Sequence, residues 1–135
     1  MQAFASTNEL YVIMRNLWNQ IKANKKMSDQ LLRSRLIVRF KYRDPDGQLT
    51  IDGSNGKELE FYFGDCNLTP DVEMSMKSDV ANQFWLGGLN VPAAMLAGRI
   101  ASRGPVHRAL ALLPVVKPAF SIYRAVRSNA KGKAA

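Results

Sequence analysis

The segment from residue 69 to residue 104 combines a strand pattern with helix signals in a fixed order, and it constrains the fold most strongly. Apolar and polar side chains alternate strictly through VEMSMK at residues 72–77, which predicts a strand with one buried face. Ser78-Asp79 then supplies an N-cap and a first-turn acid, so we expect a helix to begin there.

The remainder of this segment predicts a second helix and a second strand. Gly87-Gly88 ends the first helix, and Pro92 is well placed to open another, which Gly98 stops. The segment at residues 99–104 has the length of one short strand. A strand, two short helices and a strand in this order require the helices to fold over an apolar sheet face.

This order of residues, PDVEMSMKSDVANQFWLGGLNVPAAMLAGRIASRG, resembles the central signature of sterol carrier protein 2-like lipid-binding domains. In that family a strand beginning Pro-Asp-Val runs into a Ser-Asp helix. A basic turn, an Ala/Met-containing helix and a Gly-Lys-Leu-x-x-x-Gly strand follow. Here Gly88-Leu89-Asn90 replaces the basic turn, whereas the segment from Gly98 to Gly104 matches the second pattern closely. The resemblance covers roughly residues 31–127.

An N-terminal helix is predicted from Thr7 to Ala23. Ser6 and Glu9 have the spacing of a capping box, and an apolar stripe follows at Leu10, Ile13, Met14, Leu17 and Ile21. This stripe either packs on the sheet or contacts a membrane or a second subunit. The basic residues of Asn24-Lys25-Lys26 are expected to end the helix, where they suit its dipole.

Three strands are predicted between this helix and the central segment. Alternation of apolar and polar residues recurs at 35–43, 49–51 and 57–63, with turn residues at 44–47 and 53–56. The apolar face of the first strand comprises Leu36, Val38, Phe40 and Tyr42. Hairpin spacing of the three strands favours an antiparallel meander.

The chain after Gly104 is strongly apolar as far as Tyr123. Two prolines and three basic residues interrupt this stretch, which argues against a membrane-spanning helix and favours two short helices split near 114–118. We therefore expect a single domain at 1–127, with the helix at 7–23, followed by a disordered basic tail at 128–135.

The formal net charge of +8 limits the classes of partner. It favours anionic lipid headgroups, an acidic protein or nucleic acid, although solubility alone also explains a charge of this size. An RNA-binding sheet would expose aromatics among its basic residues, whereas Phe40 and Tyr42 share the apolar face, so nucleic acid is disfavoured. A single cysteine and the absence of a signal-peptide pattern lead us to expect a cytoplasmic bacterial protein.

Residues for catalysis or metal binding are few. His107 is the only histidine and Cys66 the only cysteine, so a Cys–His dyad of a small hydrolase is the sole catalytic pairing left open. The turn at 44–47 has its glycine too early for a calcium loop, and the segment at 53–56 lacks the Lys-Ser/Thr of a phosphate loop. The sequence predicts neither a metal nor a cofactor, and no enzymatic activity.

What remains is a surplus of apolar side chains on short elements. Each of them is compatible with an ordinary core, and methionine also suits a variable ligand because its chain repacks easily. The resemblance implies a hydrophobic tunnel lined by Met74, Met76, Phe84, Trp85, Leu89, Met95, Ile100, Leu110, Leu113, Val116 and Phe120.

The resemblance implies an α+β fold with a five-stranded, mostly antiparallel sheet covered on one face by helices. It also implies binding of a sterol, fatty acid, acyl-CoA or isoprenoid in the tunnel, with residues 114–123 as a lid. The alternative is an accessory or scaffold subunit of a lipid or ubiquinone biosynthetic complex, with protein partners or a homodimer. We expect peripheral contact with an anionic membrane through Arg99, Arg103, Arg108, Lys117 and Arg124.

Overall fold

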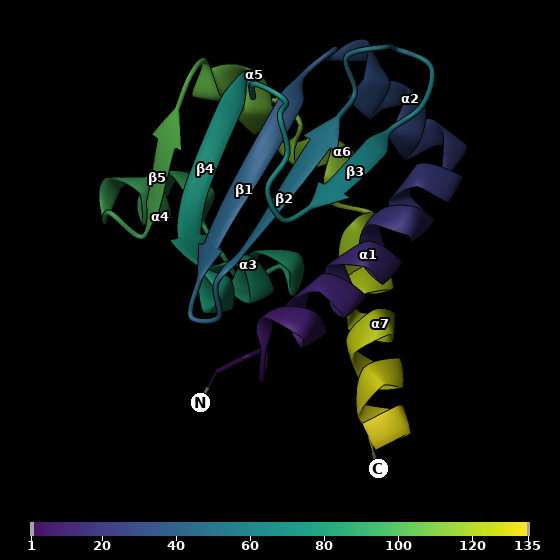
Figure 1. Cartoon of the computed structure of the whole chain (residues 1–135), viewed down its shortest axis with the longest axis vertical. Coiled ribbons are helices and arrows are strands. Elements are labelled where there is room, and N and C mark those ends of the chain that lie inside the picture. Colours follow the sequence, from purple (N-terminus) through teal and green to yellow (C-terminus); the bar gives the residue numbers. More distant parts are fainter. Residues whose placement is uncertain (1, 135) are drawn as a thin grey trace.

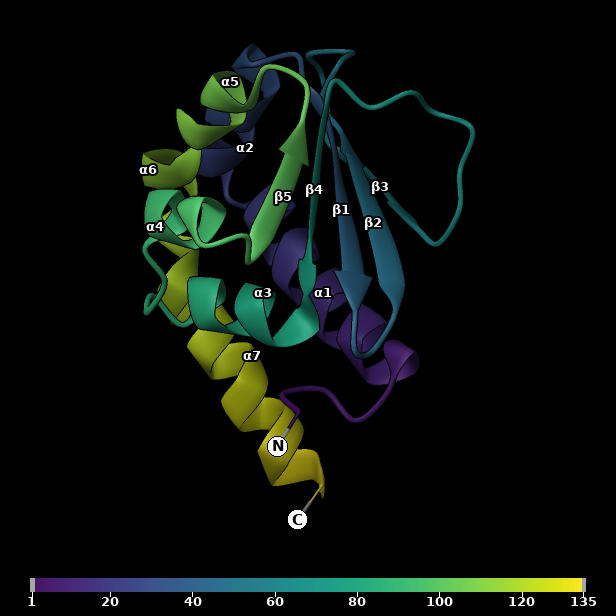
Figure 2. The same cartoon turned by 90° about the vertical axis from the view of Figure 1, so that its left-hand side faces the viewer.

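The computed structural model describes residues 2–134, with side chains described as far as Asn129, and consists of one sheet with helices on one face (Figures 1 and 2). The strands are β1 (Ile37–Arg43), β2 (Gly47–Asp52), β3 (Glu60–Phe63), β4 (Val72–Lys77) and β5 (Ile100–Arg103). The helices are α1 (Thr7–Ala23), α2 (Lys25–Arg33), α3 (Ser78–Trp85), α4 (Val91–Leu96), α5 (Val106–Leu110), α6 (Leu113–Val116) and α7 (Ala119–Ala134).

The five strands lie in the order β3-β2-β1-β4-β5. β1 pairs with β2 and β2 with β3 in antiparallel fashion, as the meander pattern predicts, and β4 also pairs with β5 in antiparallel fashion. β1 and β4 are parallel, with Val38 opposite Val72 and Arg43 opposite Lys77. The predicted α+β class and the mostly antiparallel sheet are therefore confirmed, and the one parallel pair lies at the centre.

The alternation of apolar and polar residues determines which face of the sheet the helices cover. Val38 and Tyr42 of β1 and Val72 and Met76 of β4 are buried on the inner face. Within residues 2–134 no helix covers the outer face, and the loop between β3 and β4 arches over it (Figure 2). Burial of the inner face against the helices forms the hydrophobic core.

Helix α1 has the predicted bounds, but the segment after it was misread. The Ser6 side chain accepts a hydrogen bond from the Glu9 backbone N–H at 3.1 Å and caps α1. Asn24 then caps a second helix, because its side-chain oxygen accepts from the Met27 N–H at 3.0 Å. Lys25 therefore begins α2 instead of ending α1.

The start of α3 is also different from the prediction. The helix begins at Ser78, but this side chain makes no capping bond, since Lys77 occupies the N-cap position. The Ser78 hydroxyl is fully buried and donates to the Pro45 carbonyl at 2.7 Å, which fixes the β1–β2 turn to the end of β4. Asp79 accepts a bond from the Ala3 N–H at 2.8 Å and holds the N-terminal segment.

The C-terminal region contains three helices instead of the two short ones expected: α6 lies within the predicted split at 114–118, and the longer α7 follows it. The backbone of α7 is helical to Ala134, which differs from the disordered tail predicted at 128–135; Ala135 lies outside the described residues. The Tyr123 hydroxyl donates to Asn82 Oδ1 at 2.5 Å and anchors α7 to α3. Within residues 2–134 no single helix meets the length and hydropathy of a membrane span, whereas the pair Val106–Val116 and Ala119–Asn129, bent by 71°, does so jointly.

Candidate apolar binding cavity

A cavity of about 110 Å³ lies between the inner face of the sheet and the helices. Its floor is formed by β1, β4 and β5, including Phe40 and Met74. Its roof is formed by side chains of α3, α5 and α6, including Trp85 and Leu110. None of the described side chains that line it carries a charge. The cavity is therefore suited to an apolar group and to no anion or cation.

Nine of the eleven residues predicted to line a tunnel line this cavity. They are Met74, Met76, Phe84, Trp85, Leu89, Ile100, Leu110, Leu113 and Val116. Met95 and Phe120 lie outside the lining, so the prediction is corrected at these two positions. Met95 packs on the core, and the centroid of the Phe120 ring lies 5.4 Å from that of Phe84, so Phe120 contacts a lining residue. That the nine residues bind a lipid stays a prediction.

Sequence reasoning missed the contributions of α2 and β1 to the lining. Leu31 and Ser34 come from the region of α2, which was not predicted. Val38, Phe40 and Tyr42 were placed on the apolar face of the first strand but were not predicted to line a cavity. The signal was present in the alternation of β1, since a cavity under the helices must have inner-face strand residues as its floor.

The size of the cavity limits what it accepts in this conformation. An apolar cavity of about 150 Å³ in another protein holds one benzene molecule, so 110 Å³ accommodates a small hydrocarbon group. A complete acyl chain or a sterol requires the roof to move. Met74 and Met76 give the floor some capacity to repack around a guest.

A cation lies at the edge of this uncharged cavity. The Arg108 Nη2 atom donates to the backbone carbonyl of Ser34 at 2.8 Å, and Ser34 itself lines the cavity. The Arg108 side chain is exposed. An exposed guanidinium group therefore lies beside one residue of the cavity lining.

The five cations expected to contact a membrane do not form one cluster. Arg103 is opposite Glu73 in the β4–β5 pair and lies on the outer face of the sheet, away from the cavity. Arg99 donates to Gln83 Oε1 at 2.6 Å at the end of α3. Arg108, Lys117 and Arg124 are exposed on the helical side. Arg103 is thus separated from the other four by the sheet.

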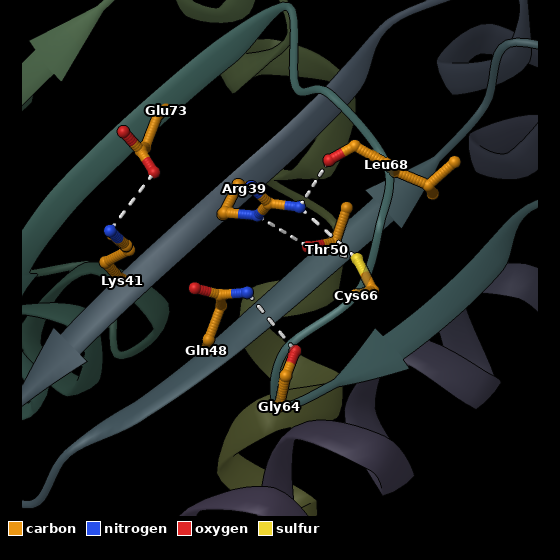
Figure 3. A network of polar contacts seen from close by, with 8 residues as sticks. All are labelled: Arg39, Lys41, Gln48, Thr50, Gly64, Cys66, Leu68 and Glu73. Atoms are coloured by element: carbon orange, nitrogen blue, oxygen red, sulfur yellow. Dashed lines mark hydrogen bonds and ion pairs between the residues drawn. The ribbon is translucent and has the colours of Figure 1, made fainter.

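The outer face carries a polar network instead (Figure 3). The Arg39 guanidinium group donates to Thr50 Oγ1 at 3.0 Å, to the Leu68 carbonyl at 2.8 Å and to Cys66 Sγ at 3.3 Å. Thr50 is fully buried beneath the loop. Because Arg39 joins β1, β2 and the loop before β4, the network fixes this loop across the sheet.

The thiol of Cys66 belongs to this network and not to a catalytic dyad. Partial burial raises the pKa of Cys66, but hydrogen bonds with Thr50, the Leu68 backbone and Arg39 outweigh it and lower the pKa below its ordinary value. His107 lies on α5, on the other side of the sheet (Figure 2). The two side chains that were considered as a dyad are therefore not brought together. Within residues 2–134 no group of three His, Cys, Asp or Glu residues is arranged to hold a metal ion.

Solved structures share this arrangement of strands and helices. Sterol carrier protein 2 from Yarrowia lipolytica, in its apo form, is 18% identical, with a TM-score of 0.62 over 88% of this chain and 94% of that chain. The sterol carrier protein domain 2 of Helicoverpa armigera is 22% identical, with a TM-score of 0.63 over 81% and 88%. A UbiJ-SCP2 ubiquinone synthesis protein is 15% identical, with a TM-score of 0.51 over 66% and 74%.

A partial likeness extends to a larger enzyme. The sec-alkylsulfatase Pisa1 from Pseudomonas sp. is 16% identical, with a TM-score of 0.53 over 62% of this chain, but the chain spans only 14% of that enzyme's length. No protein-family model and no curated protein sequence matches the chain. The matches over most of both chains confirm the fold expected from the central segment: the chain has the sterol carrier protein 2-like fold.

Proposed function

We propose that this chain binds a hydrophobic lipid in the cavity and does not alter it chemically. The observation that carries this proposal is the lining, in which apolar side chains from the sheet and the helices enclose a space without any charged group. Each methylene transferred from water into such surroundings contributes about 0.8 kcal/mol. A long hydrocarbon chain is therefore bound without directed hydrogen bonds.

Among the lipid classes, a flexible chain such as a fatty acyl or isoprenoid group fits better than a sterol. The rigid rings of a sterol must enter together, and 110 Å³ does not hold them. A linear chain enters with its end first and widens the cavity as it advances. Arg108 at the edge then favours a carboxylate or phosphate at the other end of the chain.

The roof elements α5 and α6 are the part that moves in this proposal. Leu110, Leu113 and Val116 line the cavity, whereas Tyr123 anchors α7 to α3. The movable lid therefore comprises residues 106–118, a shorter and earlier segment than the 114–123 expected from the sequence. Separation of this lid from the sheet opens the cavity to a lipid chain.

Native mass spectrometry of freshly purified protein tests the proposal, followed by organic extraction and lipid analysis. We expect a stoichiometric lipid that solvent releases, or uptake of one from a mixed lipid extract by the stripped protein. A clean apo mass with no uptake would contradict the proposal. Comparison of oleic acid with cholesterol in the uptake assay tests the preference for a flexible chain.

A second candidate function is presentation of a lipid to a biosynthetic enzyme as an accessory subunit. The structural likeness to a UbiJ-SCP2 ubiquinone synthesis protein supports it. In this case the chain retains its lipid until an enzyme partner binds. Co-purification of the loaded chain with soluble biosynthetic enzymes would favour presentation, and transfer between vesicles without any partner would favour carriage.

A further inference from the structure

The charge of the chain is divided unevenly along its length. All eleven Asp and Glu residues lie in residues 1–79, where eleven Lys and Arg residues balance them. Residues 80–135 contain eight Lys and Arg residues and no acidic residue. The formal net charge of the chain, 19 − 11 = +8, therefore arises entirely in this part. Residues 80–135 thus carry only positive formal charges, whereas the formal charges of residues 1–79 sum to zero.

Part of this cationic segment lies on the helical side of the sheet, where α4, α5 and α6 lie together in Figure 2. We call residues 91–118 the cationic flank, with the exposed cations Arg99, Arg108 and Lys117. Arg103 of β5 is not counted, because it lies on the outer face. This flank supplies part of the roof of the cavity, because Leu110, Leu113 and Val116 come from α5 and α6. A partner that binds the flank therefore lies directly over the cavity.

Two large apolar side chains in this part of the chain are exposed. Leu96 at the end of α4 is 91% exposed, and Leu86, which follows α3, is 43% exposed. Arg99 follows Leu96 closely and donates to Gln83 in the last turns of α3, so one hydrogen bond ties the two leucine-bearing turns to each other. Packing of the chain does not explain these leucines, since both leave the core for solvent.

Exposed leucines among cations identify the chemistry of the partner. A second copy would bring two flanks of the same charge together, which disfavours self-association through this surface. A nucleic acid would match the cations but offer nothing to an aliphatic leucine. An anionic bilayer provides phosphate groups for the cations and an apolar layer for the leucines.

We propose that the cationic flank docks on an anionic lipid bilayer. Leu96 and Leu86 enter the boundary between headgroups and acyl chains, and Arg99 and Lys117 contact lipid phosphates. The proposal rests on the proposed function, because docking places the lid over the layer that supplies the lipid. The exposed fractions of Leu96 and Leu86 also predict that Leu96 contributes more.

Co-sedimentation with vesicles tests the docking on purified full-length protein. The vesicles contain either phosphatidylcholine alone or phosphatidylcholine with phosphatidylglycerol at a 7:3 ratio, roughly the charge density of an anionic membrane. We expect binding to the anionic vesicles, loss of binding at high salt and weak binding to the neutral ones. Leu96→Ser should lower the partition coefficient about tenfold and Lys117→Gln about fivefold.

Val12→Ser is the matched control. Val12 is 54% exposed, but it lies on α1 in the neutral part of the chain, so its substitution should leave vesicle binding unchanged. Thermal unfolding checks that each variant retains its fold, which the exposure of Leu96 leads us to expect.

Three outcomes would overturn the proposal. The wild-type protein fails to bind anionic vesicles, or Leu96→Ser and Val12→Ser have equal effects, or single-stranded RNA binds more tightly than the vesicles and Leu96→Ser leaves that affinity unchanged. Lipid uptake is measured separately by mass spectrometry. Docking without uptake would therefore refute the proposed function alone, and uptake without docking would refute this inference alone.

Discussion

Filling the cavity should stabilise the protein and abolish lipid binding at the same time. Ala81 on α3 is buried and lines the cavity, so Ala81→Leu directs three additional carbon atoms into the empty space. Ala109 on α5 offers a second position with the same properties. Both alanines lie in helices, where leucine is well tolerated.

The volume of the cavity sets the magnitude. At about 24 cal/mol per Å³, an empty space of 110 Å³ costs the folded protein about 2.6 kcal/mol. Three carbon atoms at about 0.8 kcal/mol each recover at most about 2.4 kcal/mol. Allowing for imperfect fit, we expect Ala81→Leu to raise the free energy of unfolding by about 1–2 kcal/mol. For a chain of 135 residues this raises Tm by about 4–7 °C.

Thermal and urea denaturation measure the stability, and native mass spectrometry measures uptake of oleic acid by the same samples. Ala125→Leu is the control, because Ala125 is exposed on α7 and away from the lining. The control should alter neither property.

Two results would refute the reasoning. If Ala81→Leu and Ala109→Leu both lower the free energy of unfolding, the space is not open, because overpacking costs about 1–3 kcal/mol. If they stabilise the protein but uptake of oleic acid is unchanged, the lipid binds elsewhere.

Three further substitutions test other features. Gly104→Ala should destabilise the fold by more than about 2 kcal/mol, because φ is +88° and a Cβ atom would lie 2.1 Å from the carbonyl oxygen of Asp71. The control is Gly64→Ala, at φ +89° with no atom within 4 Å, which should cost only the backbone strain. Equal losses of unfolding free energy in denaturation would contradict this. Arg39→Ala should raise the pKa of Cys66, because the wild-type guanidinium group favours the thiolate. The pH dependence of alkylation by iodoacetamide measures this shift. An unchanged midpoint of the alkylation rate against pH would show that Arg39 does not act on the thiol. Tyr123→Phe should lower the free energy of unfolding by about 1–2 kcal/mol and speed hydrogen exchange in α7, because it removes the hydrogen bond to Asn82 of α3. Unaltered exchange would show that this hydrogen bond does not hold α7 in place.

Periodic patterns in the sequence predict most of the elements, because each pattern reports the burial of its own residues. The helix from Thr7 to Ala23 and the strand at 72–77 have the predicted bounds, and the meander is confirmed in order and pairing. Helix α2 escaped prediction because KKMSDQLLR is mostly polar and follows α1 after one residue. Asn24 ends one helix and caps the next, a double role that composition does not reveal.

The site was less predictable because it depends on contacts between distant elements. The parallel pairing of β1 with β4 places Phe40 beside Met74 in the floor, and no local pattern encodes which strands become neighbours. Phe120 is apolar like the lining residues, but its ring packs against Phe84 and Trp85 where α7 contacts α3. An apolar residue of the core and one of a cavity therefore look the same in sequence.

The parallel pair at the centre of the sheet also has a consequence for synthesis of the chain. Val38 of β1 pairs with Val72 of β4, so 72 − 38 = 34 residues must be added before this edge of β1 can be covered. At about 5–20 residues per second, the backbone of β1 waits about 2–7 s with one row of hydrogen-bonding groups open. An uncovered strand edge is a template for pairing with another chain. Slow translation between β1 and β4 would therefore promote aggregation of nascent chains, and a chain terminated before β4 would keep that edge open.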